Sequence, residues 1–131
     1  MNGIKAISKA LKIKHLIFSD HFNDPKHRRR RTIIEWDCGY GDVICATNSF
    51  WGKKKKNRIF VLTSTGVLLV IEDSKFLITA WLATPKEVEN FYGKTNLLNE
   101  KLFTKNDMPE ETWEKVNFHY KTRMCIYGED D

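Results

Sequence analysis

The sequence RIFVLTSTGVLLVIEDSKFLITAWLA, from Arg58 to Ala83, decides the fold. It contains three runs rich in β-branched, aromatic and other apolar residues, separated by turn-like segments at Ser64 to Gly66 and at Glu72 to Ser74. Runs of this length and composition are typical of strands, and such short connections imply that neighbouring strands are antiparallel. The predicted strands of this meander are Arg58 to Thr63, Gly66 to Ile71 and Phe76 to Leu82.

The region before the meander contains more candidate elements. TIIEWDC and VICATNSFW flank the turn-rich CGYGD, so these two runs are predicted strands that could pair as a hairpin. The run HLIFSDHF is ambiguous between helix and strand, because a short apolar run has no diagnostic period. From Gly3 to Ile13, apolar residues recur at helical spacing and lysines fall on the opposite side. This pattern predicts an amphipathic helix that covers the sheet.

Two helix signals follow the meander. Thr84, Pro85 and Glu87 supply an N-cap, a proline in the first turn and a capping-box acid for a helix through EVENFY that stops at Gly93. A second helix is predicted to start around Asp107 to Glu110 and to continue to about Thr122. Its expected apolar stripe is Trp113, Val116 and Tyr120. The predicted fold class is α+β, with an antiparallel sheet of about four to five strands packed by an N-terminal helix and C-terminal helices.

The composition limits the class of protein. The chain has 131 residues, of which 41% are apolar and 12% aromatic, so we expect residues 1–131 to form a single domain. A net charge of +5 favours an anionic partner such as nucleic acid. The three cysteines show no CxxC spacing, which favours reduced thiols and argues against a disulfide framework or a zinc site. No signal-peptide pattern and no membrane-length apolar run occur, so we predict a soluble cytoplasmic protein without a membrane partner.

Two basic runs are the main cationic features of the sequence. Lysine and arginine side chains supply most contacts to a phosphate backbone, so the runs predict nucleic-acid binding on one shared positive surface. Either run alone could instead be a solvated loop. The predicted nucleic-acid-binding residues of the two runs are Arg28, Arg29, Arg30, Arg31, Lys53, Lys54, Lys55 and Lys56.

Histidine is the side chain best suited to exchange protons near neutral pH, and His21 and His27 flank a break at Asn23 to Pro25. For any one of the four histidines, an ordinary surface or partly buried role is the alternative. No HExxH spacing, Walker A loop, GxGxxG or GxSxG occurs, so the sequence supports neither a metal nor a cofactor.

The last strand of the meander offers a possible binding surface. Strand alternation puts Leu77, Thr79 and Trp81 on one face and Ile78, Ala80 and Leu82 on the other. If Ile78 and Leu82 face the helices, Thr79 and Trp81 lie on an open surface, where an indole can stack on a base and a hydroxyl can hold a phosphate oxygen. The alternative is that Trp81 covers a second small cluster with Trp51 or Phe60.

Three features together resemble a known class of enzymes: S-D-H-F from Ser19 to Phe22, the arginines that follow it, and the meander closed by F-L-I-T-A-W. Spanning about Ser19 to Trp81, they resemble the RelE/barnase/EndoU/colicin class of small metal-independent ribonucleases. In that class the RNA 2′-hydroxyl attacks the adjacent phosphate, which requires an acid, a base and positive charge. The sequence departs from the pattern where Pro25 interrupts the expected helix and where TIIEWDC is typical of a strand.

The resemblance implies particular site residues and partners. His21 would be the acid or base, Arg58 a cationic stabiliser, and Thr79 with Trp81 the substrate-side pair. The first hypothesis is therefore an endoribonuclease of the toxin type, with RNA as substrate and an acidic inhibitor or antitoxin protein as partner. The second hypothesis is a noncatalytic nucleic-acid-binding module. The third is a protein-interaction or structural component whose four tryptophans build cores and an interface.

Overall fold

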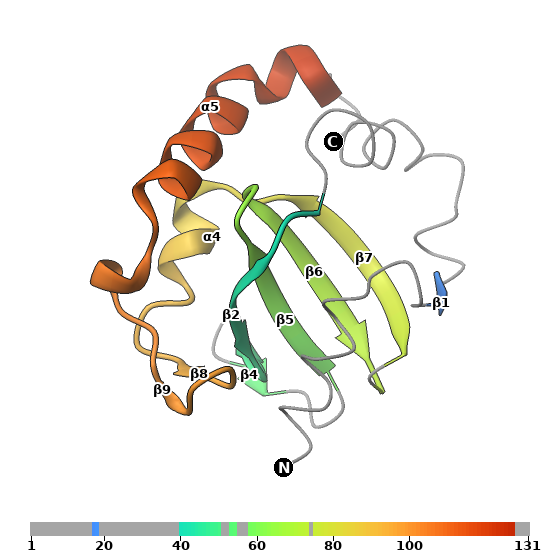
Figure 1. Ribbon diagram of the computed structural model, residues 1–131. Coiled ribbons are helices and arrows are strands. Elements are labelled where there is room, and N and C mark those ends of the chain that lie inside the picture. The colour runs from blue at the N-terminus through green and yellow to red at the C-terminus, as the bar shows by residue number, and fades with distance from the viewer. Residues whose placement is uncertain (1–16, 19–39, 51–52, 55–57, 74, 128–131) are drawn as a thin grey trace.

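A computed structural model of the protein describes residues 17–18, 40–50, 53–54, 58–73 and 75–127. Within these ranges the main sheet has five strands in the order β1-β7-β6-β5-β2 (Figure 1). The strands are β1 (Ile17–Phe18), β2 (Val43–Thr47), β5 (Arg58–Thr63), β6 (Val67–Glu72) and β7 (Phe76–Leu82). The pairs β2–β5, β5–β6 and β6–β7 are antiparallel, whereas β1 pairs with β7 in parallel.

The predicted meander is confirmed. Strands β5 and β7 have the predicted bounds, and β6 begins and ends one residue later than predicted. VICATNSFW contains β2, which pairs with β5. The run TIIEWDC lies outside the described residues, so its pairing in a hairpin stays a prediction. The parallel pairing of β1 was not predicted, because nothing in a two-residue strand reveals its direction.

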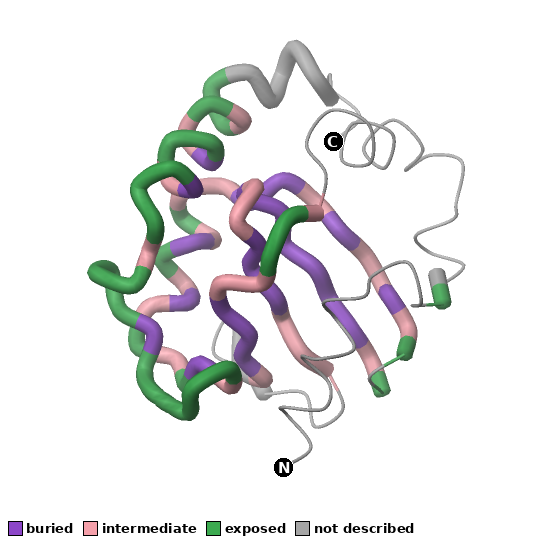
Figure 2. Tube along the Cα trace, in the orientation of Figure 1, coloured by how far each residue is buried: buried purple, intermediate pink, exposed green. Residues whose placement is uncertain are grey.

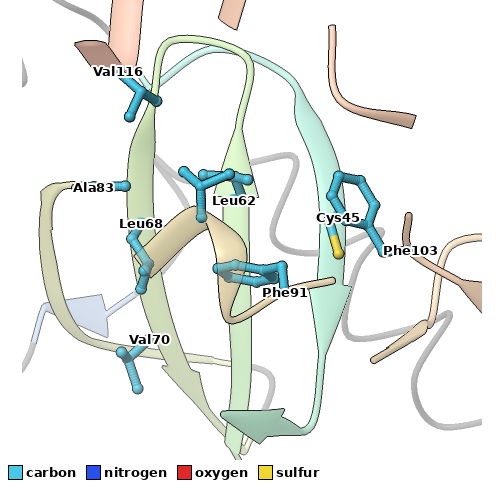
Figure 3. Packing of buried hydrophobic residues seen from close by; sticks show 9 residues of the cluster. Cys45, Leu62, Leu68, Val70, Ala83, Phe91, Phe103 and Val116 are labelled. Atoms are coloured by element: carbon cyan, nitrogen blue, oxygen red, sulfur yellow. The ribbon is translucent and has the colours of Figure 1, made fainter. Parts of the chain in front are cut away.

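The sheet is buried on both faces. Five of the six residues of β6 are buried, which fits its nearly continuous apolar run, since a strand covered on both sides does not alternate. On one face, Cys45, Leu62, Leu68 and Val70 pack with residues of the C-terminal region, and we call this the helix-side face. Figure 3 shows Phe91 and other residues of this cluster against the sheet.

The opposite face carries a second apolar cluster. Its fully or almost fully buried members are Ala46, Val61, Val67, Leu69, Ile71, Leu77, Ala80 and Leu82. Among the described residues, Tyr40, Val43, Ile59 and Leu97 pack against this cluster while remaining partly exposed. The N-terminal helix predicted to cover the sheet lies outside the described residues.

The first predicted C-terminal helix forms with its predicted cap. Helix α4 (Pro85–Glu89) follows Thr84, whose hydroxyl accepts the Glu87 backbone N–H, and the Glu87 carboxylate accepts the Thr84 backbone N–H. These reciprocal bonds satisfy two amides that the first helical turn leaves without partners. The helix ends earlier than predicted, and turns continue to Gly93, whose φ is +78°.

The second helix, α5 (Glu110–Tyr127), begins where it was predicted and extends beyond Thr122. Val116 is buried and Trp113 is half-buried, as the stripe requires, but Tyr120 is 56% exposed. Near the start of the helix, Thr112 is buried, and its hydroxyl donates to the Ser64 carbonyl in the β5–β6 turn at 2.9 Å. The prediction for Tyr120 was wrong: in helical projection it lies between Trp113 and Val116, yet it is exposed, so the apolar stripe is covered only as far along α5 as Val116.

Smaller elements complete the described fold. They are β3 (Ser49–Phe50), β4 (Lys53–Lys54), β8 (Thr95–Asn96), β9 (Lys101–Leu102) and a 3-10 turn at Lys105–Asp107. The segment around β8 lies along β2, where the Leu97 amide donates to the Ala46 carbonyl and the buried Asn96 side chain accepts the Ala46 amide. The edge of β2 is therefore covered at this point. The α+β class is as predicted.

Candidate nucleic-acid interface

The described residues contain part of the predicted site. Arg58, Thr79 and Trp81 have described side chains, and Lys53–Lys54 is placed as strand β4. His21, the arginine run Arg28 to Arg31, Lys55 and Lys56 lie outside the described residues. The approach of His21 to Thr79 and the shared surface of the two basic runs therefore stay predictions.

A β-bulge changes the predicted faces of β7. Val70 pairs with Thr79 but the next residue, Ile71, pairs with Leu77, so Ile78 is an extra residue in the ladder. Thr79 and Trp81 do share a face, as predicted. Ile78, however, packs with the helix-side cluster together with Trp81, so the prediction that it lies on the face of Ala80 and Leu82 was wrong. Leu77 packs in the opposite cluster, so the prediction that it shares the face of Thr79 and Trp81 was wrong as well.

Trp81 lies on the helix-side face and is half-buried. Its indole Nε1 donates to Oε2 of Glu87 at 2.8 Å, while Oε1 of the same carboxylate accepts the Thr84 amide at 2.9 Å. Trp81 is therefore fixed to the N-terminus of α4, and the expected open surface away from the helices was wrong for this residue. The alternative, in which Trp81 covers a cluster with Phe60, agrees with the structure because both pack against the helix-side cluster.

The end of the sheet away from α5 presents a different part of the helix-side face. Across the sheet, Glu72 of β6 pairs with Arg58 of β5 on one side and with Phe76 of β7 on the other. Two residues earlier in β6, Val70 pairs with Phe60 and Thr79 in the same way. Directly paired residues project to the same side of a sheet. These five half-buried residues, Arg58, Phe60, Glu72, Phe76 and Thr79, are called the sheet-end surface. Figure 2 shows how burial decreases toward this lower end of β5.

An ion pair crosses the sheet-end surface. The Nε atom of Arg58 donates to Oε1 of Glu72 at 2.9 Å, and the two side chains are 35% and 27% exposed. The pair joins residues that are directly opposite in the β5–β6 ladder, so its geometry is set by the backbone register. A pair this accessible adds little to stability, because water competes for both charges.

Further positive charge lies at the same end of the sheet. The Nζ atom of Lys75 lies 5.1 Å from the centre of the Phe76 ring, within the range of a cation–π contact. The β3–β4 hairpin lies against β5, and only residues 55–57 separate its lysines from Arg58. The backbone of part of the lysine run is thereby brought to the edge of the sheet-end surface.

Sequence reasoning did not identify Phe60, Glu72 and Phe76 as neighbours of Arg58. The signal was present in the turn lengths, because tight antiparallel turns fix which residues are opposite one another. Applying that register to the predicted meander would have placed Glu72 beside Arg58. The bulge at Ile78 had no comparable signal, since its local pattern continues the alternation.

Two other groups with reactive chemistry lie away from this surface. Burial, with a smaller contribution from the Asp107 carboxylate, raises the pKa of the Cys45 thiol to about 12, so the nucleophilic thiolate is not formed at neutral pH. His119, on α5, is half-buried beside Gly66 of the β5–β6 turn. Burial and the nearby Lys115 charge lower the pKa of His119 despite a hydrogen bond with the Thr65 backbone that raises it.

Within the described ranges, no three His, Cys, Asp or Glu residues gather as a metal site would require. Nor does any helix in that part of the chain have the length and apolar character needed to span a membrane. Comparison with protein-family models, with characterised proteins and with solved structures gave no match to this chain. The sheet-end surface is therefore interpreted from its own residues.

Proposed function

We propose that the protein binds single-stranded RNA on the sheet-end surface. The observation that carries this proposal is that a guanidinium group and two aromatic rings, Arg58, Phe60 and Phe76, share one half-exposed face of the sheet. Cationic groups attract the phosphate backbone, and aromatic rings stack with unpaired bases. Lys75 adds positive charge at the same end, and the backbone of Lys53–Lys54 in strand β4 lies near it.

A single strand fits this surface better than a duplex. Phe60 and Phe76 belong to β5 and β7, which are two strands apart, so their backbones are about 10 Å from each other. Each ring can stack only with a base whose face is open, and bases inside a duplex are already stacked on both sides. A flexible single strand can place successive bases on separated rings while its phosphates follow the cations.

Cleavage of the bound RNA is the second candidate function, and it is supported by the common face of Arg58 and Thr79. In the ribonuclease resemblance these are the cation and one substrate-side residue, with His21 as acid or base. The 2′-hydroxyl would lose its proton to a base and attack the adjacent phosphate, the bond from phosphorus to the 5′-oxygen would break, and an acid would protonate that leaving oxygen, which gives a 2′,3′-cyclic phosphate. Arg58 would stabilise the negative charge that develops on the phosphate. An acidic inhibitor or antitoxin protein that competes with RNA for the positive charge is part of the same proposal.

The test is incubation of the full chain with mixed single-stranded RNA in EDTA, at several salt concentrations. We expect retention that decreases with salt, and products with 2′,3′-cyclic phosphate ends if the second candidate is also correct. Phe76→Leu keeps an apolar side chain but removes the ring, and it should weaken binding by up to roughly 1 to 3 kcal/mol. Phe118→Leu on α5 is the matched control and should bind as the wild type does. Failure of the wild type to bind at low salt would contradict the proposal and favour the protein-interaction hypothesis.

A further inference from the structure

The Arg58 guanidinium is held from one side. A guanidinium group has five N–H donors, one on Nε and four on the two terminal nitrogens. The Nε donor bonds to Glu72 at 2.9 Å, and within the part of the chain that the structure describes the terminal nitrogens donate to no residue. With the side chain 35% exposed, the group is both oriented and accessible.

We infer that Glu72 is a positioning residue, which holds Arg58 so that the two terminal nitrogens bind one RNA phosphate in a bidentate manner. This inference rests on the proposed function, because it assigns the phosphate contact of the same surface. Two parallel N–H donors match two oxygens of a phosphodiester, and this geometry is specific to arginine. Fixing the plane before RNA arrives reduces the side-chain entropy lost on binding.

The surroundings of the pair support a ligand role over a purely structural one. Phe76 is paired with Glu72, and Phe60 lies two residues after Arg58 on the same face of β5. A phosphate bound at Arg58 would therefore lie near Phe60, two residues along β5, and near Phe76, which follows Glu72 across the ladder. An ion pair as accessible to water as this one contributes little to stability.

The two effects of Glu72 on RNA binding have opposite signs, which makes them separable. As a negative charge, the carboxylate repels a phosphate, so any substitution that neutralises it should strengthen binding. As a positioning group, it supplies the acceptor for Nε, and that acceptor is kept by glutamine but lost with alanine. Charge alone predicts equal effects for Glu72→Gln and Glu72→Ala, whereas positioning predicts that they differ.

The experiment compares single-stranded RNA affinity of the full-length wild type, Glu72→Gln, Glu72→Ala and Arg58→Lys at one low salt concentration. We expect Glu72→Gln to bind at least as tightly as the wild type, and Glu72→Ala to bind several-fold more weakly than Glu72→Gln. Arg58→Lys keeps the charge but loses the paired donors, so it should also bind several-fold more weakly than the wild type. Thermal unfolding of each variant establishes that it is folded.

The positioning role would be overturned if Glu72→Gln and Glu72→Ala bound RNA with equal affinity, or if Arg58→Lys bound as tightly as the wild type. Either result would leave the proposed RNA-binding function standing. Absence of binding by the wild type would instead overturn the proposed function, and the positioning role with it. If a variant does not fold, NMR of the wild-type arginine side chain decides the matter. The terminal N–H signals of Arg58 should shift on RNA addition, and unchanged signals at saturating RNA would contradict the inference.

Discussion

The two ends of the helix-side face are built from the same strands but differ in what covers them. At one end, Leu62 and Leu68 are fully buried in one cluster with Phe91, Phe103 and Val116 of the C-terminal region (Figure 3). At the other end, the sheet-end surface is half-exposed and carries an ion pair. The comparison teaches that strand composition and covering elements change together: the strands carry leucines where the C-terminal region covers them, and charged and polar side chains where it does not.

The largest effect on stability should follow from removing an aromatic side chain at the covered end. Phe91→Ala deletes a fully buried ring from the helix-side cluster, and loss of its contacts plus the remaining cavity should cost roughly 3 to 5 kcal/mol. Urea unfolding measures this cost. Phe118→Ala removes a ring that is 61% exposed and should change stability by less than about 0.5 kcal/mol. Similar losses for the two variants would mean that the covered end does not hold the fold.

A smaller loss is expected at the turn that contacts α5. Gly66 has φ +81°, and a methyl group there would lie 3.0 Å from Cγ2 of Val116. Gly66→Ala therefore combines backbone strain of about 1 to 2 kcal/mol with crowding of the Val116 side chain. Gly93→Ala is the matched control, because its φ is +78° but no described atom lies within 4 Å. We expect Gly66→Ala to lower the free energy of unfolding more than Gly93→Ala, and equal losses would show that the contact with Val116 is unimportant.

The α4 cap should contribute less again. Thr84→Ala removes the hydroxyl that accepts the Glu87 amide, which should cost about 1 kcal/mol. Because Glu87 also accepts the Trp81 indole N–H, the emission of Trp81 should change as well. Thr95→Ala, at an exposed position of β8, controls for loss of a threonine. Unchanged stability and emission in Thr84→Ala would contradict the link between α4 and β7.

The smallest effect should be a pH dependence at His119. Its folded pKa is lowered from 6.5, mainly by burial, so the unfolded chain takes up the proton first as the pH falls. The wild type should therefore lose stability relative to His119→Gln as the pH is lowered through about 6.5. Chemical unfolding of both proteins from pH 8 to pH 5 measures this difference. A difference that does not change with pH would show that His119 is not desolvated at the α5 interface.

Much of the fold could be predicted because the relevant signals are local. Each strand of the meander carries its own apolar run and turn residues, and Thr84 with Glu87 encodes the cap of α4 within four positions. The bulge at Ile78 and the parallel β1 depend on pairing between distant segments, which no local pattern reveals. Tyr120 was misplaced because its apolar pattern continues beyond Val116, and the sequence does not show how far along α5 the rest of the chain covers that stripe.

The candidate site was predictable to a lesser degree. Arg58 and Thr79 were expected to act together and do share a face of the sheet. The expected open position of Trp81 failed because a glutamate used for capping also binds its indole. Glu72 was not singled out, since its meaning depends on the register that sets it opposite Arg58.

The most direct test is amide chemical-shift mapping of the labelled full-length chain during titration with a short single-stranded RNA at low salt. It tests whether RNA binds at the sheet-end surface and not at the covered end of the same face. We predict the largest shifts at Arg58, Phe60, Phe76 and Thr79, with small shifts at Thr112 and Val116. The largest shifts on α5, or no shifts at saturating RNA, would contradict the assignment of RNA binding to the sheet-end surface.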